Sequence, residues 1–464
     1  MALDNFIKRL SSGQKARIKR AVSIIPQSLR QTPTYNKWRR FLRDAQHWPA
    51  DKIAAWQGEK LRALVRHACD HTEGYRELYK KAGVKPDDIR TAADVKHLPF
   101  TTKETFRDNL AAFTIRGGGG RYVTTGGSTG IPFGFQETIE TFEIERAFMQ
   151  SGWSWTGWRL GQRSAVLRGG FIGTENHLFE YEPFNRELCL SSYFLGSKTV
   201  GTYLDLMKKY GIRVLQAYPS SLNLLCDLIK EQGLQDRVLL DVIFMGSENV
   251  YEWQLAKFRE TFPSAMIFSW YGHCEKAVLA PWCEKTMSFH AWPFYGVTEV
   301  VGEAGNAVAQ GAEGEIVGTS FHQQITPFIR YRTMDRAVRG PERCVDCGRN
   351  FPLLDRIVGR SHEVIVTRKG RFISMTAINM HDDIFDPLRQ FQFLQEKQGE
   401  VTFRYVTKAG ALTEQQIMRI RKGLVLKLGA DVDLRLNGVP EIPRTKSGKY
   451  RFLDQRLPIQ YGDR

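Results

Sequence analysis

The chain has 464 residues, of which 42% are apolar and 25% are charged. Because a typical domain holds about 100–200 residues, this length predicts two or three packed units and excludes a short peptide or a disordered tail. The 66 basic residues exceed the 50 acidic ones and give a net charge of +16. This charge favours an anionic partner, which is a nucleotide, a nucleic acid or an acidic membrane surface.

The sequence lacks the patterns of a membrane-spanning or secreted chain. No apolar run approaches the roughly 20 residues of a transmembrane helix, and the N-terminus carries scattered charge where a signal peptide has its apolar block. Seven cysteines in so long a chain argue against a disulfide framework and for thiols or metal ligands. We therefore expect a cytoplasmic protein.

The N-terminal segment 1–60 is predicted to be a basic helical extension. Apolar residues recur there at helical spacing, at Phe6, Leu10, Ile18, Val22 and Ile25, among many Lys and Arg. Such an amphipathic helix could contact the anionic inner face of a membrane weakly, as a peripheral protein does. The alternative is a solvated helix packed on the main body.

The remaining elements alternate along the chain. Helical spacing dominates from 61 to 82, and a turn follows at 85–88. Strands are then expected at 121–125, 164–167, 213–217, 238–245 and 266–270, and helices at 138–152, 199–210 and 220–232. This alternation predicts an α/β fold with a largely parallel sheet. After Gly359, strands at 363–367 and 401–406, a helix at 413–428 and a last strand indicate a smaller α+β domain.

A Gly/Thr-rich stretch, Thr-Thr-Gly-Gly-Ser-Thr-Gly-Ile-Pro over 124–132, directly follows the first of these strands. Glycines let successive backbone N–H groups face one anion, and hydroxyls add donors, so the stretch is typical of a phosphate cradle. It is not a Walker loop, because no Lys-Ser/Thr pair follows the last glycine. An ordinary turn between a strand and a helix is the alternative.

Five further segments lie along the chain, and with this loop they resemble one family. They are Met245-Gly-Ser-Glu-Asn249, Ser269-Trp-Tyr-Gly-His-Cys-Glu275, Tyr331-Arg-Thr-Met-Asp335, Gly359-Arg-Ser-His-Glu363 and Pro443-Arg-Thr-Lys-Ser-Gly-Lys449. In this order the motifs resemble the adenylate-forming superfamily of acyl-CoA synthetases, peptide-synthetase adenylation domains and luciferases. Segments 67–76, 86–89 and 98–103 resemble its phenylacetate-CoA ligase and capsular-polysaccharide ligase branch.

The resemblance implies an ATP-dependent carboxylate ligase. A carboxylic acid would attack the α-phosphate of ATP, pyrophosphate would leave, and the acyl group would pass to CoA or to an amine or hydroxyl acceptor. The fold implied is α/β, with a large multi-layer N-terminal domain of mixed sheets over 1–359, which binds nucleotide and acid. A small mobile α+β C-terminal domain over 360–464 would carry the catalytic lysine.

The resemblance also assigns roles to residues. Lys449 would bridge ATP and the acid, and Glu275 would bind Mg²⁺, a hard cation that prefers carboxylate oxygen. Asp335 would accept hydrogen bonds from the ribose, Arg360 would add positive charge, and His362 would be the interdomain hinge. The β- and γ-phosphates would be held by Thr125, Gly126, Gly127, Ser128, Thr129 and Gly130, and the adenine and acid pockets would be lined by Ser247, Glu248, Trp270, Tyr271 and Gly272.

Three positions depart from the family pattern. The phosphate loop lacks the lysine usually found beside its proline, since Ile131 and Phe133 flank Pro132. Met334 replaces the usual glycine before Asp335, and a histidine replaces the usual Asp or Lys at the hinge. These changes bear on nucleotide affinity and on the turn that presents Asp335.

A second group of residues has the composition of a zinc site. Cys283 and His290 are followed by the Cys-x-x-Cys-Gly turn of Cys344 and Cys347, and three thiolates with one imidazole complete a tetrahedral Zn²⁺ site. Similar placements occur in some phenylacetate-CoA ligase relatives, which favours a structural zinc. Cys274 is the substitute ligand if Cys283 is not one. A redox pair or two free thiols is the alternative.

Two other functions stay open. One is an adenylyltransferase that leaves AMP on its substrate. The other is a basic, zinc-containing protein that binds nucleic acid or a membrane surface, with Trp153, Trp155 and Trp158 as a stacking platform. Core packing of these tryptophans is favoured, so nucleic acid is not the expected partner. The aromatic-rich middle of the chain favours an aryl or hydrophobic acid.

Overall fold

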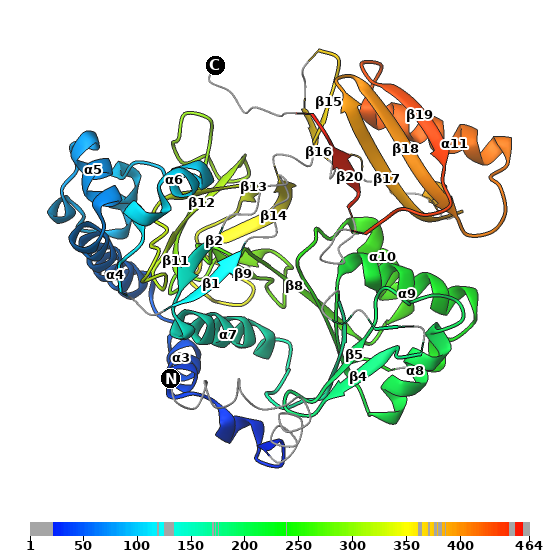
Figure 1. Cartoon of the computed structure of the whole chain (residues 1–464), viewed down its shortest axis with the longest axis horizontal. Coiled ribbons are helices and arrows are strands. Elements are labelled where there is room, and N and C mark those ends of the chain that lie inside the picture. The colour runs from blue at the N-terminus through cyan, green and yellow to red at the C-terminus, as the bar shows by residue number, and fades with distance from the viewer. Residues whose placement is uncertain are drawn as a thin grey trace.

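The structure is a computed structural model that describes most of the chain. The described residues are 22–117, 120–124, 134–168, 171, 173–174, 176–237, 239–360, 364–369, 372–374, 378, 383–385, 387–444 and 451–457. Within these ranges, every helix is too short or too polar to span a bilayer. Figure 1 shows helices and sheets of the N-terminal part, and a C-terminal sheet beside helices α9 (Pro219–Glu231) and α10 (Glu252–Thr261).

The N-terminal helices pack on the main body from Pro33 onward. The rings of Phe41, Trp48 and Trp56 contact Phe294 edge to face, with centroids 5.1, 5.6 and 5.3 Å away. The predicted helix over 61–82 is in fact two helices, because Thr72 is extended and its hydroxyl accepts a hydrogen bond from the backbone of the second. The elements are η1 (Gln27–Arg30), α3 (Pro33–Ala45), α4 (Ala50–His71), α5 (Glu73–Ala82), η2 (Pro86–Asp88), η3 (Ala92–His97), α6 (Lys103–Asn109) and η4 (Leu110–Phe113).

The central sheet has seven strands in the order β4-β5-β3-β6-β7-β8-β9. Five neighbouring strands, from β5 to β8, are parallel, and the edge strands β4 and β9 are antiparallel, so the prediction of a largely parallel sheet is confirmed. The strands are β3 (Ser164–Leu167), β4 (Phe179–Glu182), β5 (Glu187–Leu190), β6 (Val214–Ala217), β7 (Val242–Met245), β8 (Met266–Gly272) and β9 (Leu279–Pro281).

Helices cover this sheet and complete its core. Trp153 stacks on Phe244 of β7 with centroids 4.4 Å apart, and Trp158 is also buried, so these two indoles belong to the core. The helices are α7 (Ile139–Ser154), α8 (Val200–Lys209), α9 (Pro219–Glu231) and α10 (Glu252–Thr261), and η5 (Gln235–Arg237) follows α9.

A second sheet has five antiparallel strands in the order β10-β14-β13-β12-β11, which agrees with the expected domain of mixed sheets, although its individual strands were not predicted. Its strands do not alternate strictly between apolar and polar residues, because β12 is buried on both faces and β13 carries charges on both. The strands are β10 (Phe289–His290), β11 (Gly296–Val301), β12 (Glu313–Ser320), β13 (Tyr331–Arg339) and β14 (Leu353–Arg360). A separate hairpin pairs β1 (Arg121–Thr124) with β2 (Gly134–Glu137).

The C-terminal residues build a four-stranded sheet in the order β19-β18-β17-β20. Helix α11 (Glu414–Leu428) buries Ile420, Leu424 and Leu428 in a core shared with these strands. The expected strand and helix at 401–406 and 413–428 correspond to β18 and α11. The other elements are β15 (Val364–Val366), β16 (Phe372–Ser374), η7 (Asp383–Phe385), β17 (Leu388–Lys397), β18 (Glu400–Thr407), β19 (Asp433–Gly438) and β20 (Leu453–Gln455).

Candidate functional site

The parallel strands bring several predicted residues to one edge of the central sheet. Strands β7 and β8 are neighbours, so the segments 245–249 and 269–275, which follow or include their carboxyl ends, lie side by side. In open α/β sheets this edge is where ligands bind. Five of the residues assigned to nucleotide and acid therefore lie at this edge, namely Ser247, Glu248, Trp270, Tyr271 and Gly272.

Glu275 is a buried carboxylate just beyond β8. Its Oε1 accepts a hydrogen bond from the Tyr331 hydroxyl at 3.0 Å, and its Oε2 lies 3.1 Å from His273 Nδ1. Burial acts to raise the pKa of Glu275, but the hydrogen bond and charge of His273, with the Tyr331 hydroxyl, outweigh it and lower the pKa to about 2. The carboxylate is thus ionised at neutral pH, which is the form that a hard cation such as Mg²⁺ binds.

Asp335 lies in β13 and contacts the predicted pocket residue Tyr271. The Tyr271 hydroxyl donates to Asp335 Oδ2 at 2.7 Å, so the two segments meet across the two sheets. The preceding residue, Met334, has φ of 64°, and its N–H donates to Glu315 Oε1 at 3.1 Å. The backbone here keeps the left-handed conformation of the usual glycine. A glycine adopts this conformation without strain, whereas a methionine is strained in it.

The Trp270 side chain packs against the backbone that follows the neighbouring strand β7. A Cβ on Gly246 would come within 2.7 Å of the indole, so this position accepts no side chain without a shift. Ser247, the next residue, has φ of 69°. Glu248 accepts hydrogen bonds from the N–H and the hydroxyl of Ser220, at 2.9 and 3.0 Å. Its carboxylate therefore stabilises the start of α9, a contact that the sequence does not reveal.

A buried charge network beside Glu275 was missed by sequence reasoning. Lys276 Nζ lies 2.7 Å from Glu137 Oε2 and 3.5 Å from Glu145 Oε2, and the lysine side chain is 5% exposed. Glu137 is fully buried and also pairs with Arg121 at 2.6 Å. These residues connect the loop of Glu275 to the β1–β2 hairpin. The partners are far apart in sequence and belong to no motif, so no pattern pointed to them.

Some predicted residues lie outside the described ones. These are the phosphate-loop residues 125–130, the hinge residue His362 and the catalytic candidate Lys449, and nothing is described of the side chain of Arg360. The flanking strands show that the loop joins β1 to β2 of an antiparallel hairpin, whereas the alternative considered above was a strand-to-helix turn. The backbone of Arg360 is paired with Asp335 in the β13–β14 ladder.

The four predicted zinc ligands lie together, with their ligand atoms all within 4.8 Å of one another. The sulfurs of Cys283 and Cys344 are 3.9 Å apart, and Cys347 Sγ is 3.3 Å from His290 Nε2. Zn–S bonds of about 2.3 Å in a tetrahedron separate two sulfurs by about 3.8 Å, so this spacing fits zinc. Burial lowers the pKa of His290 to about 3, which keeps the imidazole neutral and able to bind a metal. Cys274 is exposed and outside the group.

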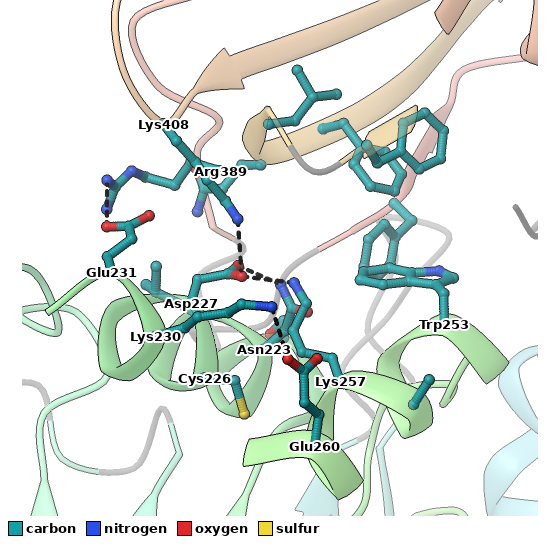
Figure 2. Close-up of a pocket in the computed structure, with 18 of the residues that line it drawn as sticks. Asn223, Cys226, Asp227, Lys230, Glu231, Trp253, Lys257, Glu260, Arg389 and Lys408 are labelled. Carbon is teal, nitrogen blue, oxygen red and sulfur yellow. Dashed lines mark hydrogen bonds and ion pairs between the residues drawn. The ribbon is translucent and has the colours of Figure 1, made fainter. Parts of the chain in front are cut away.

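A cavity of about 840 Å³ lies between α9, α10 and the C-terminal sheet. Asp227 of α9 is almost fully buried and accepts from Lys257 of α10 at 2.8 Å and from Lys408, which follows β18, at 3.2 Å. Figure 2 shows these three side chains converging, with a second pair between Glu231 and Arg389 at 3.3 Å. Two of the ion pairs therefore join the N-terminal helices to the C-terminal sheet.

Comparison with known proteins agrees with the motifs. Residues 365–455 match the CapK C-terminal domain family. The chain is 24% identical over 325 residues to phenylacetate-coenzyme A ligase of Aromatoleum evansii, covering 68% of this chain and 72% of that one. It is 21% identical to protein CapK of Staphylococcus aureus, covering 85% and 88%.

The fold also agrees with a solved structure. The structure of 2-hydroxyisobutyryl-CoA ligase in the postadenylation state, in complex with 2-HIB-AMP, superposes with a TM-score of 0.70 at 18% identity and covers 88% of this chain and 90% of that one. The large N-terminal part and the smaller C-terminal part of such ligases are both represented. The chain is thus similar in sequence to phenylacetate-CoA ligases and to CapK over most of its length, and its fold is that of a CoA ligase.

Proposed function

We propose that the protein is an ATP-dependent carboxylate ligase that forms an acyl-adenylate, releases pyrophosphate and transfers the acyl group to an acceptor. The observation that carries the proposal is the pairing of two buried carboxylates with tyrosines at the edge of the parallel sheet, Glu275 with Tyr331 and Asp335 with Tyr271. The carboxylate of Glu275 suits the metal ion that accompanies a triphosphate, and that of Asp335 suits the hydroxyls of a ribose. The two carboxylates together therefore match two parts of Mg²⁺-bound ATP.

The roles of this chain's residues follow from their positions. Glu275 would hold Mg²⁺, which when bound neutralises phosphate charge. Asp335 would orient the ribose by accepting hydrogen bonds from its hydroxyls, while Trp270 and the backbone at Ser247 would border the adenine and acid pockets. Lys449 would stabilise the charge that gathers between the acid and the α-phosphate.

The C-terminal segment 360–464 is proposed as a domain that moves about His362 after adenylation, which would withdraw Lys449 from the site. The proposed zinc would have a different purpose. Cys283, His290, Cys344 and Cys347 supply four protein ligands and leave no open position, so the ion would fasten two turns together without taking part in the reaction.

Acid-dependent exchange of pyrophosphate into ATP, screened over a panel of carboxylic acids, tests the proposal. We expect exchange with at least one acid, a loss of it in Glu275→Gln and Asp335→Asn, and no loss in Lys230→Gln, which alters an exposed ion pair between α9 and α10. Absence of exchange with every acid would overturn the proposal. The likeness to phenylacetate-CoA ligases supports CoA as the acceptor, and the CapK match supports an amine or hydroxyl.

Product analysis identifies the acceptor. A ligase frees AMP when CoA, an amine or a hydroxyl compound accepts the acyl group. A product that retains AMP would instead show an adenylyltransferase. Each acceptor class is supplied separately to the acyl-adenylate formed in the exchange assay, and release of free AMP is measured for each.

A further inference from the structure

The guanidinium of Arg168 lies at the carboxyl edge of the central sheet, beside the proposed acid pocket. Arg168 directly follows β3, whose Val166 pairs with Gln216, and the ladder continues from Gln216 to Phe244 and from Phe244 to Phe268. Val166 and Phe268 therefore share one face of the sheet. Arg168 follows Val166 by two residues and Trp270 follows Phe268 by two, so these side chains lie on that same face, because side chains alternate along strands. The guanidinium carbon is 5.3 Å from the centre of the Trp270 ring.

Two nitrogens of this guanidinium are buried without a hydrogen-bond partner, although the Glu187 carboxylate is near enough to interact with it electrostatically. Its Nε and Nη2 atoms are shielded from solvent and have no hydrogen-bond acceptor in the described part of the chain. Two more deeply buried guanidinium groups are ion-paired: Arg330 is paired with Glu299 at 3.2 Å, and Arg349 with Glu284 at 2.9 Å. Buried donors without an acceptor are costly, so a missing acceptor is the physical explanation of the arrangement.

The unpaired atoms around Trp270 are donors. Besides the two Arg168 nitrogens, the indole Nε1 of Trp153 is buried without a partner, and its ring lies 5.6 Å from that of Trp270. Neither a guanidinium nor an indole N–H can accept a hydrogen bond. A group that binds between Arg168 and Trp153 must therefore accept hydrogen bonds. Because Arg168 is always charged, that group should be an anion.

The reacting carboxylate of the substrate cannot be that anion. It must meet the α-phosphate on the side of Glu275, which follows β8, whereas Arg168 follows β3. Strands β6 and β7 lie between them, so the two backbones are about three strand spacings, roughly 14 Å, apart, and the Arg168 side chain spans part of this distance to reach the Trp270 ring. Arg168 thus faces the far end of a bound acid.

We propose that the enzyme activates an acid that carries a second carboxylate, or a like anion, remote from the reacting one, and that Arg168 binds this group. A guanidinium fork holds a carboxylate with two parallel hydrogen bonds, and the Trp270 face supports a flat spacer such as a benzene ring. The inference rests on the proposed function and adds its substrate class, an aryl or short aliphatic dicarboxylic acid.

Matched acids test the proposal in the pyrophosphate-exchange assay. Benzoate is compared with terephthalate, phenylacetate with 4-carboxyphenylacetate, and hexanoate with adipate. We expect kcat/KM at least about 10-fold higher for the diacid of one pair or more. Arg168→Met should lower it about 10²-fold for that diacid and less than about 3-fold for its monoacid, which is the range for losing one partner of a buried charge pair.

Two control variants separate charge from geometry. Arg168→Lys keeps the charge without the fork and should fall between wild type and Arg168→Met. Arg163→Met removes an exposed arginine that directly precedes β3 and donates a hydrogen bond to the Tyr210 carbonyl. This variant should behave as wild type. Preference of the wild type for the monoacid of every pair, or an equal loss for both acids in Arg168→Met, overturns the proposal.

Binding measured without turnover distinguishes this inference from the proposed function. The thermal melt of the full chain is recorded with each acid alone, for wild type and Arg168→Met. If no acid supports exchange but a diacid raises the Tm of wild type more than that of Arg168→Met, the ligase proposal fails and the anion site stands. If no diacid gives a larger shift than its monoacid and exchange shows no diacid preference, the anion site fails. The wild-type comparison decides even where a variant does not fold.

Discussion

Replacing Lys276 with Met should destabilise the protein, because it removes the cation that Glu137 and Glu145 share. Loss of one partner of a buried ion pair costs about 3–5 kcal/mol. We expect the lower end, about 3 kcal/mol, because Arg121 still pairs with Glu137 from a half-exposed position. With an unfolding entropy of about 2.1 cal/mol/K per residue and a cooperative unit of roughly 340 residues, Tm should fall by about 4 °C.

The loss of stability in Lys276→Met should depend on pH. Burial already raises the pKa of Glu145 although Lys276 opposes it, and removing the lysine raises that pKa further. A carboxyl group whose pKa is raised by folding favours the folded state below its unfolded pKa, and this advantage is lost as pH rises through the folded pKa. Lys276→Met should therefore be less stable relative to wild type at about pH 8 than at about pH 5.

Thermal melts of wild type, Lys276→Met and Lys230→Met measure both effects. Lys230 pairs with Glu260, but both side chains are mostly exposed, so its loss should shift Tm by less than about 1 °C. Adding Glu137→Gln and Glu145→Gln to Lys276→Met should restore much of the stability, because no buried charge is then left bare. A Lys276→Met melt that matches wild type at about pH 8, or a deficit that does not change with pH, would refute the reasoning.

Three further predictions concern other parts of the chain. Lys449→Ala should lower acid-dependent pyrophosphate exchange about 10²–10³-fold, since the lysine acts in the first half-reaction. Transfer of the acyl group from a presynthesised acyl-adenylate to its acceptor should persist. Loss of both half-reactions in a folded variant contradicts this prediction. The purified protein should contain close to one zinc per chain, and Cys347→Ser should lower Tm because it opens a closed site; a chain with almost no zinc, isolated without chelator, contradicts the assignment. Met334→Gly should change the free energy of unfolding by less than about 1 kcal/mol, because relief of the left-handed strain offsets the extra freedom of the unfolded chain. Urea unfolding checks this, and a loss above about 2 kcal/mol would show that the methionine side chain stabilises the site.

Patterns of local origin could be predicted from the sequence. The strand expected at 164–167 is β3 with the same bounds, because short apolar runs between helices are typical of parallel strands. The Cys and His side chains could be grouped because few residue types bind zinc and two of them share one tight turn. The antiparallel sheet could not be predicted, since its strands carry charges that pair across the sheet and obscure the alternation.

Contacts between distant segments could not be predicted either. Lys276 and Glu137 meet because β2 and the loop after β8 are brought together by the whole fold, and neither belongs to a recognisable pattern. Arg168 is one arginine after a strand, and the absence of an acceptor for two of its nitrogens in the described part of the chain is visible only in three dimensions. Sequence motifs thus point to the groups that a family shares, while residues particular to this chain depend on packing.

The carboxylate that Lys257 and Lys408 share has a consequence for the proposed domain movement. If the C-terminal part departs, Asp227 loses Lys408 but keeps Lys257 on the adjacent helix, so no bare charge is left behind. The ion pairs that are lost are then Asp227 with Lys408 and Glu231 with Arg389, and ionic strength screens the small free energy of each. The balance between adenylation and acyl transfer should therefore respond to salt, and added electrolyte should favour the released orientation.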